Sequence, residues 1–203
     1  MSLSAGRRCW LLAGAGLLSL AGGGYLGLVT GAVPIDVGVG RRIRALGPLI
    51  VDIAAPPESV FDLIAQPYLG RRTRAMADKI RILEHGEDMV LAAHRTPIRG
   101  WLVATTVETV RFTRPDRVDF RLVRGPVPYV VESFELSSDE SGTRLVYRGE
   151  LGTDLWTAGQ RWGDLVAARW ESVVADSLTA VKAEAERQTA QSPTRYGGPA
   201  DRC

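Results

Sequence analysis

Cysteine and histidine are scarce in this sequence, and their scarcity excludes several kinds of site. The two cysteines, Cys9 and Cys203, lie near opposite ends of the 203-residue chain. This separation excludes a disulfide scaffold and any CxxC-type zinc or redox site. Two histidines, His85 and His94, are too few for a histidine-rich metal centre. We therefore expect neither a metal nor a cofactor.

Neither sign of charge dominates the composition, and the common catalytic motifs are missing. The chain has 25 basic and 23 acidic residues, a net charge of +2, without the basic excess of a nucleic-acid-binding protein. It contains no HExxH, GxSxG or Walker motif, and no GxGxxG between a strand and a helix. These absences argue against a hydrolase, kinase or dehydrogenase and against a nucleic-acid partner. No catalytic residue is assigned.

The sequence has one long run without charge, from Cys9 to Ile35. About 20 apolar residues cross a bilayer as a helix, so residues 9–35 are long enough for a single-pass membrane anchor. A cleaved secretory signal and a twin-arginine export signal at Arg7-Arg8 are the alternatives. We favour the anchor, because the run exceeds the 7–15 apolar residues typical of a signal peptide. Arginines flank the run on both sides, so the side of the membrane stays unassigned.

Two further features belong to this region. Gly23, Gly27 and Gly31 form two GxxxG steps that would bring two helices together in a homodimer, although a glycine-rich segment also produces such spacing by chance. After the run, Arg41, Arg42 and Arg44 would meet anionic lipid headgroups or form a solvated charged face. The same two alternatives apply to Arg71, Arg72 and Arg74, for which we prefer the solvated face.

The remaining sequence predicts one α+β domain over residues 36–188, followed by a disordered tail over residues 189–203. A short strand over 49–53 precedes a helix that begins at Pro57 and ends near Pro67. A second short helix reaches Asp78. Turn signals then separate six strand-like runs, at 80–85, 89–96, 101–113, 117–124, 127–137 and 143–152. Neighbouring runs joined by tight turns should pair antiparallel.

The last predicted element is a long amphipathic helix over residues 156–186. Its apolar arc holds Trp162, Val166, Trp170, Val173 and Val181. The opposite side holds Arg161, Asp164, Glu171, Lys182 and Glu186. A curved antiparallel sheet buries such a helix against its concave face.

These elements resemble the START-like, or SRPBCC, superfamily in its polyketide cyclase and dehydratase-like branch. The resemblance rests on residues 51–64, VDIAAPPESVFDLI, on 133–136, SFEL, and on 142–147, GTRLVY, together with the closing helix. It implies a helix-grip fold, in which the sheet wraps around the long C-terminal helix. It also implies an internal cavity for hydrophobic or amphipathic molecules.

Alternation along the predicted strands selects Glu132 as a carboxylate that points into the cavity. Glu132 shares the parity of Val130, Phe134 and Leu136, which should face the core. Burial would raise its pKa and suit it to general acid–base chemistry. The alternatives are a paired structural glutamate, or a shift of one residue in register that would turn the side chain to solvent.

Seven further residues complete the predicted ligand-binding set. Tyr147 would donate a hydrogen bond to a ligand, or serve as a core ring. His94 would shuttle protons, or be ordinary structure. Trp162 and Trp170 would form a substrate platform, or pack as a lid. The rest of the set lines the expected cavity with apolar side chains: Phe120, Phe134 and Val166.

Three functions remain open at this point. The first is a membrane-anchored, non-catalytic protein that holds a lipid, isoprenoid or polyketide-like molecule. The second is a cyclase- or dehydratase-type enzyme in which Glu132 or His94 moves protons. The third is a regulatory or interaction domain whose cavity is filled by its own side chains.

Overall fold

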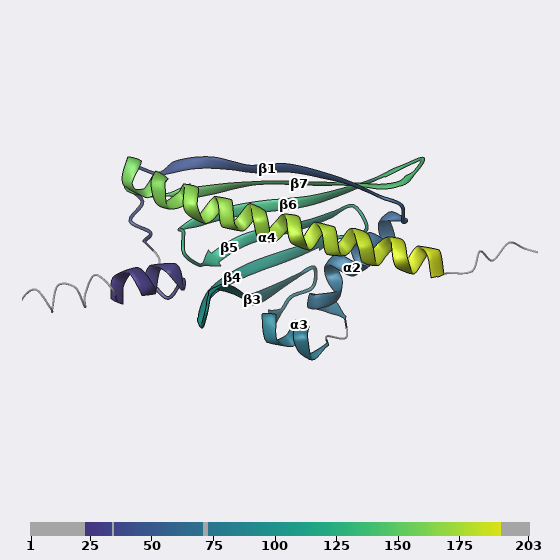
Figure 1. Cartoon of the computed structure of the whole chain (residues 1–203), viewed down its shortest axis with the longest axis horizontal. Helices are drawn as coiled ribbons and strands as arrows, with labels where there is room; N and C mark the ends of the chain where they lie inside the picture. The colour runs from purple at the N-terminus through teal and green to yellow at the C-terminus, as the bar shows by residue number, and fades with distance from the viewer. Residues whose placement is uncertain (1–22, 34, 71–72, 192–203) are drawn as a thin grey trace, which may run out of the picture.

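A computed structural model describes residues 23–33, 35–70 and 73–191. Its centre is one antiparallel sheet in the order β1-β7-β6-β5-β4-β3-β2 (Figure 1). The strands are β1 (Arg42–Ile53), β2 (Ile80–His85), β3 (Met89–Arg99), β4 (Leu102–Thr113), β5 (Arg117–Arg124), β6 (Tyr129–Asp139) and β7 (Gly142–Thr153). The helices are α2 (Pro57–Leu69), α3 (Arg74–Lys79) and α4 (Trp156–Gln191). This arrangement confirms the α+β class and the antiparallel sheet.

Alternating burial gives the sheet an inner and an outer face. In β5, Val118, Phe120 and Leu122 are buried, whereas Asp119 and Arg121 lie on the other face. In β6 and β7 the predicted inward residues Val130, Glu132, Leu145 and Tyr147 are likewise buried. The register of these three strands is therefore the predicted one.

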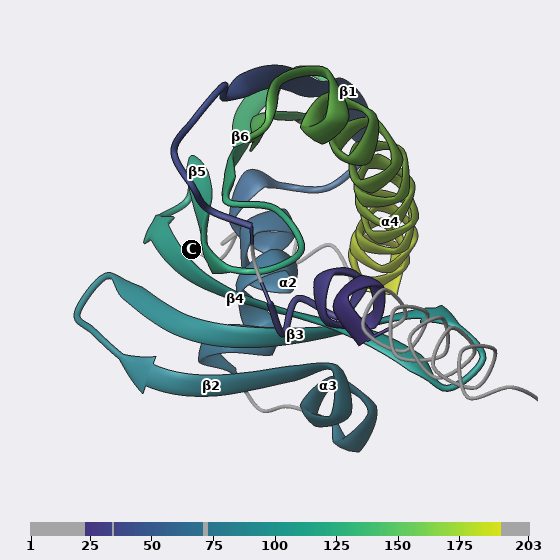
Figure 2. The same cartoon turned by 90° about the vertical axis from the view of Figure 1, so that its left-hand side faces the viewer.

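The sheet is strongly curved, and α4 lies along its open side (Figure 2). The buried stripe of α4 differs from the prediction, because its most buried residues are Gly163, Ala167, Val174, Leu178 and Ala185. The predicted tryptophans and valines flank this stripe and are only partly buried. Small side chains bring the helix axis closest to the sheet, so they occupy the centre of the contact.

Polar bonds fasten α4 along β1. Glu171 accepts a hydrogen bond from Gly47 N at 2.9 Å, and Glu186 accepts one from Ala54 N at 3.1 Å. Lys182 donates to the carbonyl of Asp52 at 2.5 Å. The predicted opposite side of the helix thus includes the side chains that hold it to the edge strand.

Three element boundaries also differ from the prediction. β1 begins at Arg42 rather than at residue 49, because it pairs with β7 from Arg42–Thr153 onward. α2 continues past Pro67 to Leu69. α4 extends to Gln191, so residues 189–191 of the predicted tail are helical, while residues 192–203 and Cys203 lie outside the described residues.

The uncharged N-terminal run is described only from residue 23 onward. Residues 23–29 are helical, and the chain turns over residues 30–33. Gly31 adopts a φ of +72° and is buried, and a Cβ there would lie 2.6 Å from the carbonyl oxygen of Thr105. Only glycine fits this left-handed, close-packed position. The helical part of the described run therefore ends at residue 29, before the end of the uncharged run at Ile35.

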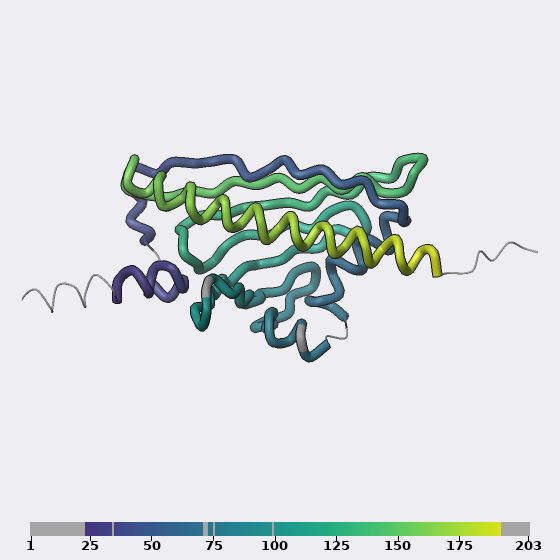
Figure 3. The backbone as a smooth tube through the Cα atoms, viewed as in Figure 1, coloured from purple at the N-terminus to yellow at the C-terminus, as the bar shows by residue number. Residues whose placement is uncertain are grey.

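The same turn affects the predicted GxxxG steps of Gly23, Gly27 and Gly31. Gly31 lies in the turn and not on a helix face with Gly23 and Gly27, so the homodimer remains a prediction that depends on the other two glycines. Over the described residues, no helix is both long enough and apolar enough to span a membrane. Residues 9–22 of the predicted anchor, with Cys9, lie outside that part of the chain. The backbone trace shows residues 23–33 at the same end of the molecule as the start of α4 (Figure 3).

Candidate functional site

Glu132 is a buried carboxylate held between the sheet and α4. It lies opposite Gly149 in the β6–β7 pair and is 9% exposed. Its Oε2 atom accepts a hydrogen bond from the Tyr147 hydroxyl at 2.8 Å and another from Trp170 Nε1 at 2.7 Å. β6, β7 and α4 therefore meet at one carboxylate oxygen.

The surroundings of Glu132 favour its protonated form. Burial raises its pKa to about 7, and the negative charge of Glu108 acts in the same direction. The hydrogen bonds from Tyr147 and Trp170 oppose this shift because they stabilise the carboxylate. At neutral pH this group can therefore either donate or accept a proton.

A second polar group lies on β3, β4 and α2. His94 Nδ1 is 2.8 Å from Glu108 Oε2, and Thr106 donates to Glu108 Oε1 at 2.6 Å. The Tyr68 hydroxyl is 3.2 Å from His94 Nε2. His94 and Thr106 are directly paired in the β3–β4 register. Two adjacent strands thus assemble a buried histidine–carboxylate pair.

The histidine–carboxylate pair is stabilised in its charged form. Burial acts to lower the pKa of His94, but the charge and hydrogen bond of Glu108 outweigh it and leave the pKa raised. Burial likewise acts to raise the pKa of Glu108, yet His94 and Thr106 leave it lowered. Burial raises the pKa of the Tyr68 phenol well above its ordinary value. The charges of this pair also act on Glu132, whose pKa is raised by Glu108 and lowered by His94.

A row of aromatic rings connects the two polar groups. The ring centroids of Tyr68 and Phe120 are 5.9 Å apart, those of Phe120 and Phe134 are 5.4 Å apart, and those of Phe134 and Tyr147 are 5.2 Å apart. Edge-to-face and tilted contacts of this kind stabilise the packing beyond the area that they bury. The row forms an apolar wall with a polar group at each end.

The structure brings together six of the eight predicted ligand-binding residues. Tyr147 and Trp170 are both bonded to Glu132, Phe120 and Phe134 belong to the aromatic row, and His94 belongs to the second polar group. The two others are placed differently. Trp162 donates to the carbonyl of Pro126 at 2.8 Å, and Val166 packs against the core.

Sequence reasoning missed Glu108, Thr106 and Tyr68. Glu108 and Thr106 share the parity of Val110, which is fully buried in β4. Once the inner face of β4 is known, alternation places both side chains on it. Tyr68 lies seven residues after the buried Phe61 on α2, which is the helical spacing of one face.

Two hollows are present, and the lining of the larger one includes Glu132 and Phe120 of this cluster. A depression of about 660 Å³ lies mainly on the outer face of the sheet, where its lining includes Arg111, Arg121 and Arg148. A smaller one of about 220 Å³ lies between the N-terminal segment and the start of α4, lined by Leu28, Ile35 and Trp162 among others. Within residues 23–33, 35–70 and 73–191, no group of three or more His, Cys, Asp or Glu side chains could hold a metal ion.

Solved structures of similar fold include aromatase/cyclases. The Zhui aromatase/cyclase from Streptomyces sp. R1128 has a TM-score of 0.60 at 19% identity, over 73% of this chain and 96% of that one. The di-domain ARO/CYC StfQ from the steffimycin biosynthetic pathway has a TM-score of 0.55 at 14% identity, over 74% of this chain and 52% of that one. A START superfamily protein from Mycobacterium smegmatis has a TM-score of 0.50 at 12% identity, over 72% of this chain and 98% of that one. At these identities the likeness shows the fold alone.

Sequence comparison agrees with the fold. No curated protein matches this chain. The family described as "Polyketide cyclase / dehydrase and lipid transport" matches residues 50–186, which is more than half of the sequence and includes every residue of the buried cluster. The chain therefore belongs to the polyketide cyclase/dehydrase and lipid transport family, and its fold is similar to that of a START superfamily protein.

Proposed function

We propose that this chain binds a hydrophobic or amphipathic small molecule, such as a lipid, an isoprenoid or a polyketide-like compound, between its sheet and α4. The observation that carries the proposal is the buried Glu132 carboxyl, bonded to Tyr147 and Trp170 at one end of an aromatic row. Apolar walls supply affinity through buried area, and a few fixed polar groups supply orientation. The uncharged run over residues 9–35 holds the protein at a membrane, which supplies such ligands.

The charge of the cluster selects the polar end of the ligand. Glu132 is a neutral acid over much of the pH range below 7, and Glu108 carries a negative charge nearby. An anionic head group would be repelled by Glu108, whereas a hydroxyl or carbonyl oxygen can accept a hydrogen bond from protonated Glu132. The favoured ligand is therefore long, apolar and uncharged at its polar end.

The test uses the full chain purified in detergent, extracted with organic solvent and analysed by mass spectrometry for co-purified molecules. Val166→Trp adds bulk on the inner side of α4, while Leu165→Trp introduces the same side chain at a neighbouring residue that is 68% exposed. We expect a stoichiometric ligand in the wild type and in Leu165→Trp, and its loss from Val166→Trp. Equal ligand content in both folded variants would contradict the proposal.

A cyclase- or dehydratase-type enzyme is the second candidate, and the raised pKa of Glu132 favours it. Ionised Glu132 would take a proton from a carbon between two carbonyls, and the resulting enolate would attack a further carbonyl of the same chain. The new carbon–carbon bond leaves an alkoxide, which recovers the proton from Glu132. Atoms and charge balance without a metal or redox partner.

A model poly-β-keto thioester tests this second candidate. The rate constant should rise with pH around 7, where Glu132 ionises, and Glu132→Gln should remove the activity. Glu135→Gln, on the outer face of the same strand, should leave the rate unchanged. Full turnover by Glu132→Gln would exclude this mechanism and leave ligand binding as the function.

A further inference from the structure

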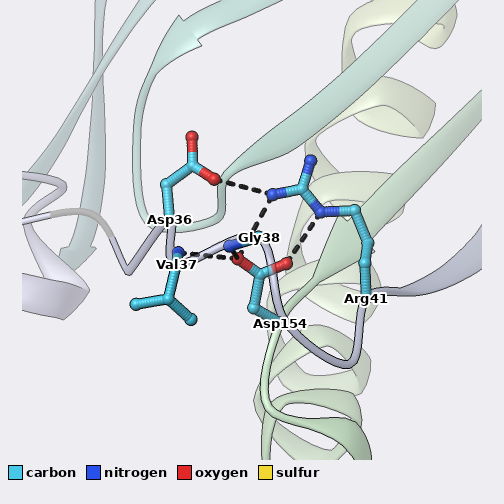
Figure 4. Close-up of polar contacts among 5 residues, drawn as sticks. All are labelled: Asp36, Val37, Gly38, Arg41 and Asp154. Carbon is cyan, nitrogen blue, oxygen red and sulfur yellow. Dashed lines mark hydrogen bonds and ion pairs between the residues drawn. The ribbon is translucent and has the colours of Figure 1, made fainter.

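The segment that connects the N-terminal helix to β1 is bonded firmly to the domain. Asp154, which is 3% exposed, accepts hydrogen bonds at Oδ2 from the backbone N–H groups of Val37 and Gly38, at 2.8 and 2.7 Å. Its Oδ1 accepts from Arg41 Nε at 2.7 Å, and Arg41 also bonds Asp36 (Figure 4). One carboxylate therefore fixes three positions of the connecting segment.

Backbone hydrogen bonds hold the N-terminal segment to the domain at three further positions. Leu155 N donates to the carbonyl of Val39 at 2.9 Å, and Trp156 N donates to that of Gly40 at 3.0 Å. Thr105 N donates to the carbonyl of Thr30 at 2.9 Å. A flexible linker would lack such bonds. The domain is consequently held in a defined orientation relative to the end of the uncharged run.

The end of the domain beside this segment exposes large apolar side chains. Trp101, at the tip of the β3–β4 hairpin, is 83% exposed, and Trp156, at the start of α4, is 54% exposed. The hairpin tip lies next to the N-terminal helix in both views (Figures 1 and 2). We call the exposed set here the apolar end: Val33, Val37, Val39, Trp101, Leu155 and Trp156.

The surroundings of the apolar end indicate what covers it. Tryptophan is enriched at the level of lipid headgroups, because its ring is apolar and its N–H is polar. Arg42 and Arg161 are exposed at the adjoining ends of β1 and α4, where they suit anionic headgroups. Arg41 and Arg44 are instead paired with carboxylates of the domain. In the sequence, residues 9–22 precede the N-terminal helix and are also uncharged.

We infer that the apolar end rests on the surface of a lipid bilayer, with Trp101 and Trp156 at the headgroup level. This inference depends on the membrane attachment in the proposed function. The bonded segment leaves no slack between the uncharged run and the domain, so a bilayer that holds the run contacts Trp101 and Trp156. Membrane attachment then fixes the orientation of the domain relative to the bilayer as well as its location.

The experiment places a fluorescent probe on the full chain. In a Cys9→Ser, Cys203→Ser background, Trp101→Cys carries an NBD label, and the protein is reconstituted in vesicles of phosphatidylcholine and phosphatidylglycerol. The control is a label at Glu140→Cys, in the exposed β6–β7 turn at the opposite end of the sheet. We expect a blue-shifted emission and several-fold stronger quenching by doxyl-labelled lipids at position 101 than at position 140.

Each other result overturns the inference in a recognisable way. Equal quenching at both positions means that the apolar end does not contact lipid. A blue shift at position 101 in detergent and vesicles alike, without lipid quenching, means that residues 9–22 or a second copy of the chain cover it. A chain that does not float with vesicles removes membrane attachment itself, while the ligand content of Val166→Trp still judges the binding site separately.

Discussion

The indole nitrogen of Trp170 lies 2.7 Å from Oε2 of Glu132, and this bond joins α4 to the middle of the sheet. The Tyr147 hydroxyl donates to the same oxygen. Two donors on one carboxylate oxygen stabilise the ionised form, while burial and Glu108 destabilise it. This balance sets the proton affinity of the site and leads to the first two predictions.

Glu132→Gln should change how stability depends on pH. The pKa of Glu132 is 4.5 when exposed and about 7 in the folded chain, so the folded state binds this proton more tightly. The stabilisation is fully present below pH 4.5 and is lost as pH rises through 7, by roughly 3 kcal/mol at most. Glutamine does not ionise, so the variant should gain stability relative to the wild type above pH 7.

Thermal unfolding of the full chain across this pH range measures the difference. Glu135→Gln, on the outer face of β6, is the matched control and should follow the wild type. If the difference between wild type and Glu132→Gln stays constant from pH 4 to pH 8, Glu132 does not have a raised pKa.

Tyr147→Phe should raise the pKa of Glu132 above 7. The hydroxyl stabilises the carboxylate, and the ring of Tyr147 is otherwise retained in its contact with Phe134. Loss of a hydrogen bond to a charged group costs roughly 1.5–3 kcal/mol, so the variant should be less stable by about that amount where Glu132 is ionised. Carboxyl carbon NMR of labelled glutamate measures the titration, and an unchanged midpoint would contradict the assigned bond.

Glu108→Gln should lower the pKa of His94 below its ordinary value. Burial lowers the pKa of His94, and in the wild type the charge and hydrogen bond of Glu108 outweigh it; without Glu108, burial is opposed only by the smaller effect of Glu132. The stabilisation from His94 is present below pH 6.5 and is lost as pH rises through its raised pKa. That from Glu108 is present above pH 4.5 and is lost as pH falls through its lowered pKa. The pair therefore stabilises the fold most strongly between these two limits.

Imidazole NMR of a His85→Asn background, in which His94 gives the one side-chain imidazole signal, follows this titration. Thr109→Val, on the opposite face of the same strand from the Glu108 side chain, is a suitable control. A His94 titration that is the same in this background with and without the Glu108→Gln substitution would mean that the two groups do not interact.

Asp154→Ala should release the connecting segment. The substitution leaves the N–H groups of Val37 and Gly38 and the guanidinium of Arg41 without their acceptor. We expect about 2 kcal/mol of lost stability and faster amide exchange at Val37 and Gly38. Asp164→Ala removes an exposed ion pair with Arg44, and should cost less than about 1 kcal/mol. Equal effects of the two substitutions would show that Asp154 does not hold the segment.

The success of the sequence analysis at Glu132 and its failure at Glu108 have the same physical origin. Apolar residues of one parity dominate β6, so alternation assigns the inner face there without ambiguity. In β4, Val103 and Val107 have one parity while Val110 and Phe112 have the other, and no inner face could be assigned. The local pattern is informative only where one face is consistently apolar.

Other errors arise from contacts that a local pattern does not contain. The buried stripe of α4 includes Gly163 and Ala167, because close approach to the sheet favours small side chains. A prediction from the hydrophobicity of the helix faces gives most weight to large apolar side chains instead. Arg42 and Arg44 lie in a strand because β7 provides the partner. Long-range packing and pairing decide these features, so the sequence pattern alone could not predict them.

The bonds of α4 are distributed unequally between its two long sides, and this has a consequence for ligand exchange. Glu171, Lys182 and Glu186 fasten one side to β1. Toward β3, among the residues that the structure describes, α4 makes one side-chain hydrogen bond, from Arg169 to the carbonyl of Pro97. Separation along β3 therefore breaks fewer bonds than separation along β1. We expect α4 to separate from the sheet on its β3 side while it stays bonded to β1, so that a ligand enters near Pro97. Amide hydrogen exchange should then be faster in β3 than in β1.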